Sequence, residues 1–490
     1  MAIDLSSISF GAPAAERDDG LESYFLESES FRRVRDHKRL IILGNRGSGK
    51  SAIFRMIAAQ EKAQGRIVLE LAPEDYSYEL LKQSLATESQ GSWAKQGAYA
   101  AAWKYLIYVL TMKHVTGPKM GRGVKRGAAG RIYSYLRDNH GSFEKNPIAT
   151  LISYLKRLEG VKIGKFEVGT KTRELQSLYR LEELGTLLDD LNETCGRKPV
   201  TVLVDELDKG WDASEDAIAF VSGLFQAAIS INKRTPNIRV LISLRKELYD
   251  NIPALYEDAQ KVRDVIEEIQ WDERELFEMI TLRIRHALKE AIDIDRQDLW
   301  NRVFVERLDY RKNFSFHYMI DRTLYRPREI IELCSQVINF AAECGEKPPL
   351  NYQVVSVAEN RYSEARVKDI AAEYRFQYPG LLSVFETFRG RVYNISREAI
   401  ELHCLRISVG DIQVAAAAKL WSEDMEPERM VDMLWRVGFL RARAVGGLKA
   451  RRRRGSEYLG SHQISHLNLF SIQNFHIHPM YRAYLGLKEK

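Results

Sequence analysis

The sequence predicts an α/β fold built around a parallel β-sheet, and three observations lead to this class. Short apolar runs of strand length alternate with segments of helical periodicity over residues 36–270. A glycine-rich loop directly follows the first apolar run and precedes a helix. Another apolar run ends in two adjacent carboxylates. Parallel strands buried on both faces read as continuous apolar runs, so we expect helices on both faces of the sheet.

The elements are expected in a definite order. A polar lead-in ends in a helix at Asp19–Arg35, and a second helix at Ala52–Gln60 follows the glycine-rich loop. Mostly helical patterns over 77–191 indicate a large helical insertion before the third strand. The predicted strands are Arg39–Leu43, Arg66–Leu71, Val200–Val204, Ile238–Leu244 and Val265–Ile269.

Four parts are predicted along the chain, because 490 residues are too many for a single hydrophobic core. They are a lead-in over 1–35, a core over 36–270, a helical lid over 271–347 and a C-terminal domain over 348–490. Pro348–Pro349 marks the last boundary. In the last part, helices at Asp411–Trp421 and Pro427–Val437 precede a strand, a basic loop and another strand, which is the order of a winged helix.

Composition argues against several classes of protein. No apolar run approaches the ~20 residues of a membrane span, and the N-terminus lacks the regions of a signal peptide. The four cysteines have neither metal-binding nor disulfide spacing. His476 and His478 are not joined by a cysteine or carboxylate cluster, so no metal site is expected there. We expect a cytoplasmic protein without a membrane partner.

Residues 44–51 read GNRGSGKS and match the phosphate-binding pattern G-x-x-x-x-G-K-[ST]. Glycines let successive backbone N–H groups face the phosphates, and the following helix adds its positive N-terminal end. Lys50 would reach the β- and γ-phosphates, and the Ser51 hydroxyl would ligate Mg²⁺. ATP and Mg²⁺ are therefore the expected cofactors. The predicted nucleotide-binding residues are Gly44, Asn45, Arg46, Gly47, Ser48, Gly49, Lys50, Ser51 and Ala52.

The run VTVLVDE at 200–206 supports the same chemistry. Asp205 at the end of this predicted strand would hold the magnesium ion, together with Ser51. Glu206 would orient and deprotonate the attacking water. The alternative is a pair of solvated loop charges. With the phosphate-binding loop upstream, the functional interpretation is favoured.

Together, these motifs and their order resemble AAA-type P-loop ATPases, closest to the ORC/Cdc6-like and STAND-like branches. The resemblance covers about Asp19–Val337. It implies a polar sensor at the end of the fourth strand, which would be Ser243 or Arg245, and STAND-like members favour Arg245. It also implies a second sensor arginine in the lid, where Arg328 would reach the γ-phosphate. The catalytic residues implied in this way are Lys50, Glu206, Arg245 and Arg328.

Each sensor has a simpler alternative. Arg245 would then only form an ion pair with Glu247 or Asp250, and Arg328 would be an exposed arginine at a helix end. The chain also departs from the family pattern, because the long basic insertion is not part of a minimal AAA module. No arginine finger is identifiable, and Arg263 is only a weak positional guess.

Two basic segments are candidate contacts with nucleic acid. The first contains no acidic residue and comprises Lys104, Lys113, Lys119, Arg122, Lys125, Arg126, Arg131 and Arg137. Its interleaved aromatics suit a helix face and are expected to be core. The second is Arg451, Arg452, Arg453 and Arg454, which would lie at the tip of the wing and contact phosphates. A solvated charged loop, or a winged helix that contacts protein, is the alternative for this second segment.

The expected function is an ATPase whose turnover drives a conformational or oligomeric switch. The N-terminal GAPAAERDD, followed by a helix and GNRGSGKS, looks like bacterial ATPases from antiphage defence and mobile-element contexts. The resemblance implies a homo-oligomer that itself acts on or senses nucleic acid and works with a partner effector protein. One alternative is a STAND-like signalling ATPase that controls its effector without binding nucleic acid. Another is a scaffold that binds nucleotide only for stability.

Overall fold

The structure is a computed structural model, and it describes residues 3–72, 92–117, 127–139, 181–209, 211, 213–252, 263–443, 458–464 and 467–489. The chain forms two compact units. The core unit comprises Glu27–Asn45 and Lys50–Ile269. The C-terminal unit comprises Met1–Leu26, Arg46–Gly49 and Gln270–Lys490. The tip of the glycine-rich loop therefore groups with the C-terminal unit.

The core unit is built on a parallel sheet with the strand order β2-β3-β4-β1-β5. Its strands are β1 (Ile41–Gly44), β2 (Ile67–Leu71), β3 (Val200–Val204), β4 (Ile238–Arg245) and β5 (Ile266–Glu268). All residues of β1 and β3 are buried, which explains their uninterrupted apolar sequence. This strand order, with the glycine-rich loop after β1, confirms the predicted α/β fold of AAA-type P-loop proteins.

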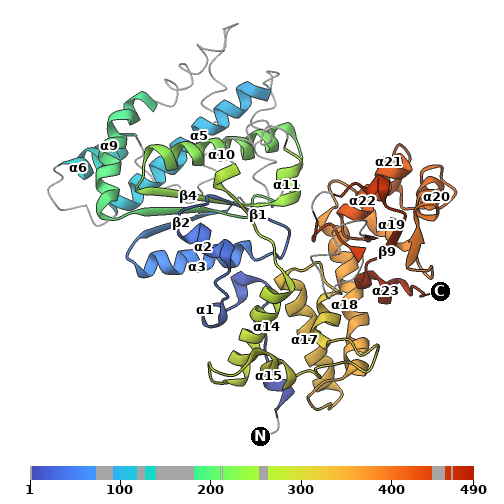
Figure 1. Ribbon diagram of the computed structural model, residues 1–490. Coiled ribbons are helices and arrows are strands. Elements are labelled where there is room, and N and C mark those ends of the chain that lie inside the picture. Colours follow the sequence, from blue (N-terminus) through green and yellow to red (C-terminus); the bar gives the residue numbers. More distant parts are fainter. Residues whose placement is uncertain are drawn as a thin grey trace. The chain divides into compact units, whose positions relative to one another are not determined.

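Helices cover both faces of this sheet, as expected. Figure 1 shows α2 (Glu29–Arg35) and α3 (Lys50–Ala63) on one face, and α5 (Ser92–Thr116) and α10 (Glu215–Arg234) on the other. The segment between β2 and β3 contributes α5, α6 (Ala128–Asn139) and α9 (Leu181–Arg197), so the predicted helical insertion is present. The short α11 (Lys246–Asp250) follows β4, and a 3₁₀ turn at Arg263–Val265 precedes β5.

The prediction of one continuous helix at Asp19–Arg35 is wrong. The structure has α1 at Leu21–Tyr24 and α2 at Glu29–Arg35, separated by extended backbone at Phe25 and Ser28. The Ser28 side chain accepts a hydrogen bond from the Phe31 N–H and caps α2. A serine in this position starts a new helix rather than continuing the old one.

The lid part of the C-terminal unit is helical. It contains α14 (Glu273–Leu288), α15 (Arg296–Asn301), α16 (Ser315–Ile320) and α17 (Pro327–Glu343), and α18 (Tyr352–Glu373) follows it. Asp272 and Glu275 form a capping box that fixes the first turn of α14, and Pro327 occupies the first turn of α17. Among the described residues, no helix has the length and hydropathy needed to cross a bilayer.

The N-terminal segment is anchored on this lid. It carries 3₁₀ turns at Leu5–Ser7 and Ala15–Arg17. The buried Arg283 guanidinium of α14 donates to Asp18 Oδ2 at 3.0 Å and to the Phe10 carbonyl. A buried ion pair of this kind fixes the segment because separating its partners would leave buried charges unpaired.

The remaining elements form the predicted winged-helix-like arrangement. A four-stranded antiparallel sheet has the order β6-β9-β7-β8. The elements are α19 (Leu381–Glu386), β6 (Asn394–Ser396), α20 (Arg397–Ser408), α21 (Ala416–Ser422), α22 (Pro427–Arg436), β7 (Leu440–Arg443), β8 (Tyr458–Leu459), a 3₁₀ turn at Leu469–Ser471, β9 (Asn474–Ile477) and α23 (Pro479–Leu485). The helices precede the strand–loop–strand segment in the expected order.

Candidate nucleotide-binding site

The glycine-rich loop connects the end of β1 at Gly44 to the start of α3 at Lys50. Gly47 and Gly49 have φ angles of 79° and 97°, which only glycine adopts readily. The Lys50 ammonium donates to the Gly44 carbonyl at 2.7 Å and to the Asn45 carbonyl at 3.1 Å. Burial lowers the Lys50 pKa, whereas the carboxylates of the core unit oppose that change. The ammonium is therefore a half-buried charge that a phosphate would stabilise.

Two predicted magnesium ligands lie next to each other in the core unit. The Ser51 hydroxyl donates to Asp205 Oδ2 at 3.0 Å. Asp205 Oδ1 accepts from the Glu206 N–H at 2.8 Å, which orients the carboxylate. A hydroxyl and a carboxylate at hydrogen-bond distance are a donor set that fits Mg²⁺, which prefers oxygen ligands and keeps several waters. Both residues, and Ala52 in the first turn of α3, are partly exposed.

Glu206 follows Asp205 in a left-handed backbone conformation, with a φ of 59°. Non-glycine residues in this region are uncommon and merit a closer look near a functional site. Its carboxylate forms an ion pair with the Lys209 ammonium at 2.7 Å. The sequence analysis missed Lys209, although it follows the carboxylate pair by only three positions.

Arg245 ends β4 directly beside Gly44 in the strand register. Its guanidinium pairs with Asp208 and lies 3.7 Å from Glu247 Oε1. The contact with Glu247 is the simpler alternative considered for this residue, and Asp208 was not foreseen. Ser243, the other sensor candidate, is buried within the sheet at 1% exposure. Of the two candidates, Arg245 lies nearer the end of the strand, and its role remains a prediction.

Arg328 lies against the tip of the glycine-rich loop within the C-terminal unit. Its Cβ is 2.9 Å from where a Cβ on Gly47 would stand, and its N–H donates to the Gly47 carbonyl at 3.3 Å. Burial, followed by the nearby Arg46, lowers the pKa of Arg328. The Arg328 side chain is thus half-buried, whereas the simpler alternative expected an exposed arginine at the helix end. Arg263 is exposed at the 3₁₀ turn before β5, and no observation assigns it a role.

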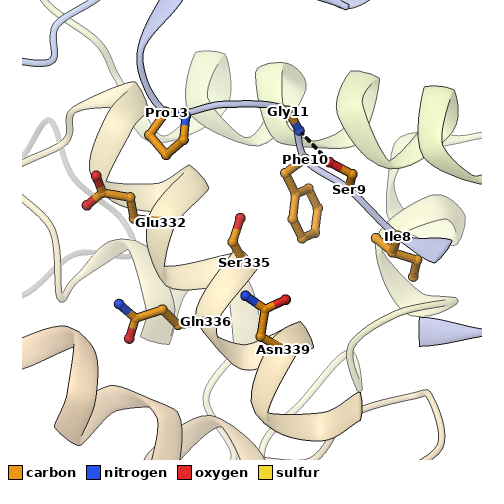
Figure 2. A pocket seen from close by; sticks show the side chains of 9 residues that line it. All are labelled: Ile8, Ser9, Phe10, Gly11, Pro13, Glu332, Ser335, Gln336 and Asn339. Carbon is orange, nitrogen blue, oxygen red and sulfur yellow. Dashed lines mark hydrogen bonds between the residues drawn. The ribbon is translucent and has the colours of Figure 1, made fainter. Parts of the chain in front are cut away.

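A pocket of about 310 Å³ lies between the N-terminal segment and α17. Figure 2 shows Phe10 and Ile8 on one side and the polar side chains of α17 on the other. The Arg328 Nε donates to the carbonyl of Pro13, another lining residue, at 3.4 Å. Arg328 therefore joins the loop tip to this pocket. The other lining residues are Ser9, Gly11, Glu332, Ser335, Gln336 and Asn339.

The described members of the basic segment Lys104–Arg137 differ in exposure, and contact of this segment with nucleic acid stays a prediction. Lys113 is 9% exposed and Lys104 is half-buried. Arg131 pairs with Asp190, and Arg137 pairs with Asp138 at 2.8 Å. Lysines on a helix packed against α10 lose solvent access because the aromatic residues beside them form the core. The other members, Lys119, Arg122, Lys125 and Arg126, lie outside the described residues.

Three of the aromatic residues interleaved in this segment belong to the hydrophobic core. Trp103, Tyr105 and Tyr108 are at most 5% exposed. The Trp103 Nε1 donates to the Phe220 carbonyl of α10 at 3.2 Å. This confirms the expectation that they are not stacking platforms for bases.

The predicted wing tip, Arg451–Arg454, lies outside the described residues. The helix before it, α22, carries ion pairs between Arg429 and Glu426 at 3.3 Å and between Arg436 and Asp432 at 2.6 Å. Arg429 therefore pairs with the N-cap residue of α22, and Arg436 pairs with a carboxylate one turn earlier in the same helix.

Comparisons with known proteins give three findings. Residues 274–371, from α14 into α18, match the FunZ-associated C-terminal helical domain. The chain is 25% identical over 514 residues to the putative transposon gamma-delta 80.3 kDa protein of Escherichia coli (strain K12), covering 99% of this chain and 68% of that protein. The solved structure of the Aeropyrum pernix ORC2 protein, in ADPNP–ADP complexes, aligns over 93% of this chain and 89% of that chain, with 12% identity and a TM-score of 0.36.

Proposed function

We propose that this protein binds and hydrolyses ATP with Mg²⁺. The observation that carries the proposal is the 3.0 Å hydrogen bond from the Ser51 hydroxyl to Asp205, beside the half-buried Lys50 that ends the glycine-rich loop. Magnesium, when bound, would neutralise charge on the phosphates. Glu206 would accept the proton of the attacking water, and Lys50 would exchange its loop carbonyls for phosphate oxygens.

We further propose that the pocket beside α17 receives the base of the nucleotide. Arg328 touches both the loop tip and the pocket wall, so a ligand held by the loop could extend into the pocket. Ile8 and Phe10 offer apolar contact to a ring, and Gln336 and Asn339 offer amides. A side-chain amide can donate to and accept from the edge of adenine at the same time, which favours adenine over guanine.

The base pocket predicts a change in nucleotide preference. Replacing Gln336 and Asn339 by alanine should reduce the preference for ATP over GTP about tenfold, since one well-placed amide contributes ~1–3 kcal/mol of discrimination. The readout is the ratio of the two nucleotides' kcat/KM values. Asn360→Ala, on the exposed face of α18, is the control. An unchanged ratio in the double variant would place the base elsewhere.

ATP turnover would drive a conformational or oligomeric switch that acts on or senses nucleic acid. The similarity to a transposon protein and to the FunZ-associated domain motivates a role in a mobile-element or defence context. The proposed partners are further copies of this chain, an effector protein, and nucleic acid through Arg451–Arg454. The alternative is a signalling ATPase that controls its effector without touching nucleic acid.

Phosphate release, measured with and without DNA or RNA at low salt, separates these functions. The proposal expects turnover that rises with nucleic acid, and stimulation that fades as salt increases. Lys50→Ala is the control for contaminating ATPases. Turnover that nucleic acid leaves unchanged, combined with ATP-dependent oligomerisation by light scattering, would favour the signalling alternative. Wild-type phosphate release no faster than that of Lys50→Ala would contradict hydrolysis altogether.

A further inference from the structure

Three successive carbonyls at the tip of the glycine-rich loop accept hydrogen bonds from outside the loop. Arg46 O accepts from the Arg326 Nη1 at 3.2 Å, and Gly47 O accepts from the Arg328 N–H at 3.3 Å. Ser48 O accepts from the Trp271 indole N–H at 2.8 Å. All of these residues belong to the C-terminal unit. The donors come from the segment just before α14 and from the start of α17.

These contacts fix the direction of the loop's N–H groups. In a trans peptide the carbonyl of one residue and the N–H of the next lie in one plane and point in opposite directions. Holding the carbonyls of Arg46, Gly47 and Ser48 on the outer side therefore turns the N–H groups of Gly47, Ser48 and Gly49 to the inner side. Successive N–H groups on one side of a loop make an anion-binding concavity.

The donors are themselves held in place. Arg326 is 5% exposed, and its Nη1 also donates to Glu373 Oε2 at 2.8 Å. Its Nε lies 3.7 Å from Glu329 Oε1. Burial alone would lower the Arg326 pKa, but Glu373 and Glu329 outweigh it and raise the pKa. The guanidinium stays charged and cannot turn away without leaving two carboxylates unpaired. Trp271 immediately precedes the capping box of α14, which fixes its backbone.

We propose that Trp271 and Arg326 are positioning residues that pre-orient the amides of the loop for the nucleotide phosphates. Their hydrogen bonds to the loop go to its outer carbonyls. Their effect is on affinity: an ordered loop does not have to lose conformational freedom when the nucleotide binds. This inference rests on the proposed nucleotide binding and adds to it the residues that shape the phosphate site.

The test is equilibrium binding of a fluorescent ATP analogue with Mg²⁺ to Trp271→Phe, which loses the indole N–H and keeps an aromatic ring. One hydrogen bond of ~1 kcal/mol predicts a Kd raised about fivefold. We expect the kcat of this variant at saturating ATP to stay within twofold of the wild-type value, and its KM to rise. Trp300→Phe is the matched control, because its indole N–H donates to Ser315 Oγ at 2.8 Å, inside the lid. It should lower the Tm and leave the Kd unchanged.

A second variant, Arg326→Gln with Glu373→Gln and Glu329→Gln, removes the guanidinium, which is the other side-chain donor, and leaves neither carboxylate as a buried unpaired charge. It should raise the Kd further when combined with Trp271→Phe. An identical Kd for wild type, Trp271→Phe and Trp300→Phe would overturn the positioning role while nucleotide binding stands. A wild-type protein that binds no magnesium nucleotide would overturn the proposed function and this inference together.

Discussion

At the scale of single residues, Gly47 is the position where the loop tolerates least change. Its φ of 79° is strained for any side chain, and a Cβ there would stand 2.9 Å from the Arg328 Cβ. Gly47→Ala should therefore weaken binding of magnesium ATP about five- to thirtyfold, because the left-handed conformation costs ~1–2 kcal/mol. Gly65→Ala is the control, since Gly65 has a φ of 74° but nothing within 4 Å of its added Cβ. Equal Kd values for the two variants would contradict this account of the loop tip.

Glu206 is the residue on which hydrolysis depends. Glu206→Gln keeps the size of the side chain and removes its ability to take a proton, so kcat should fall ~10²–10⁴-fold. Binding of ATP should change less than threefold, because the carboxylate is not a phosphate ligand. Single-turnover hydrolysis and nucleotide binding, measured on the same preparation, check both statements. A variant that hydrolyses ATP at the wild-type rate would remove Glu206 from the mechanism.

At the scale of elements, α20 makes the winged-helix-like part sensitive to acid. Burial, followed by Arg391 and Arg406, lowers the pKa of His403 to about 4, so the folded state holds this imidazole neutral. The unfolded chain binds the proton at its ordinary pKa of ~6.5. Stability is therefore unaffected above that pH and falls as the pH drops from ~6.5 towards 4, by at most ~1.4 kcal/mol per pH unit.

The check is the Tm of wild type and His403→Gln between pH 7.5 and 5. The variant should be less stable than wild type at pH 7.5 because His403 is only 4% exposed. Its Tm should then fall less steeply as the pH drops. Parallel curves for the two proteins would show that His403 does not titrate in this range.

The ion pairs on the exposed face of α22 bear on which element would bind nucleic acid. Because Arg429 and Arg436 pair with nearby carboxylates, Arg429→Ala with Arg436→Ala should change DNA affinity less than threefold. Replacing Arg451–Arg454 by alanine should weaken binding strongly and reduce the salt slope by about one for each arginine that binds a phosphate. Salt titrations of DNA binding by both variants check this. A larger loss of DNA affinity in the Arg429→Ala, Arg436→Ala variant would place the interface on α22.

At the scale of the whole molecule, the parts that could be predicted from sequence are those encoded locally. Strands β1 and β3 were predictable because burial on both faces leaves an uninterrupted apolar run in each. The phosphate-binding loop was predictable because its chemistry demands glycines, a lysine and a hydroxyl at fixed spacing. The break between α1 and α2 was missed because a single serine cap outweighed the helical periodicity.

The hydrogen bonds that shape the site from outside the loop could not be predicted. Trp271 and Arg326 reach carbonyls 223 and 280 positions away in sequence, and no local pattern marks either residue as a partner of the loop. In the Lys104–Arg137 segment, the density of basic residues along the sequence likewise did not show that Lys113 is buried. Charge counted along a chain does not reveal which side of a helix faces the core.

Titration calorimetry of the folded protein with ATP tests the central claim most directly. Wild type should bind ATP in the presence of Mg²⁺ and more weakly with a chelator, because Ser51 and Asp205 would hold the metal. Lys50→Ala should bind at least tenfold more weakly, because a charge-assisted hydrogen bond from an ammonium to a phosphate contributes more than ~1.4 kcal/mol. No measurable heat for wild type with magnesium ATP, and no difference for Lys50→Ala, would contradict the account.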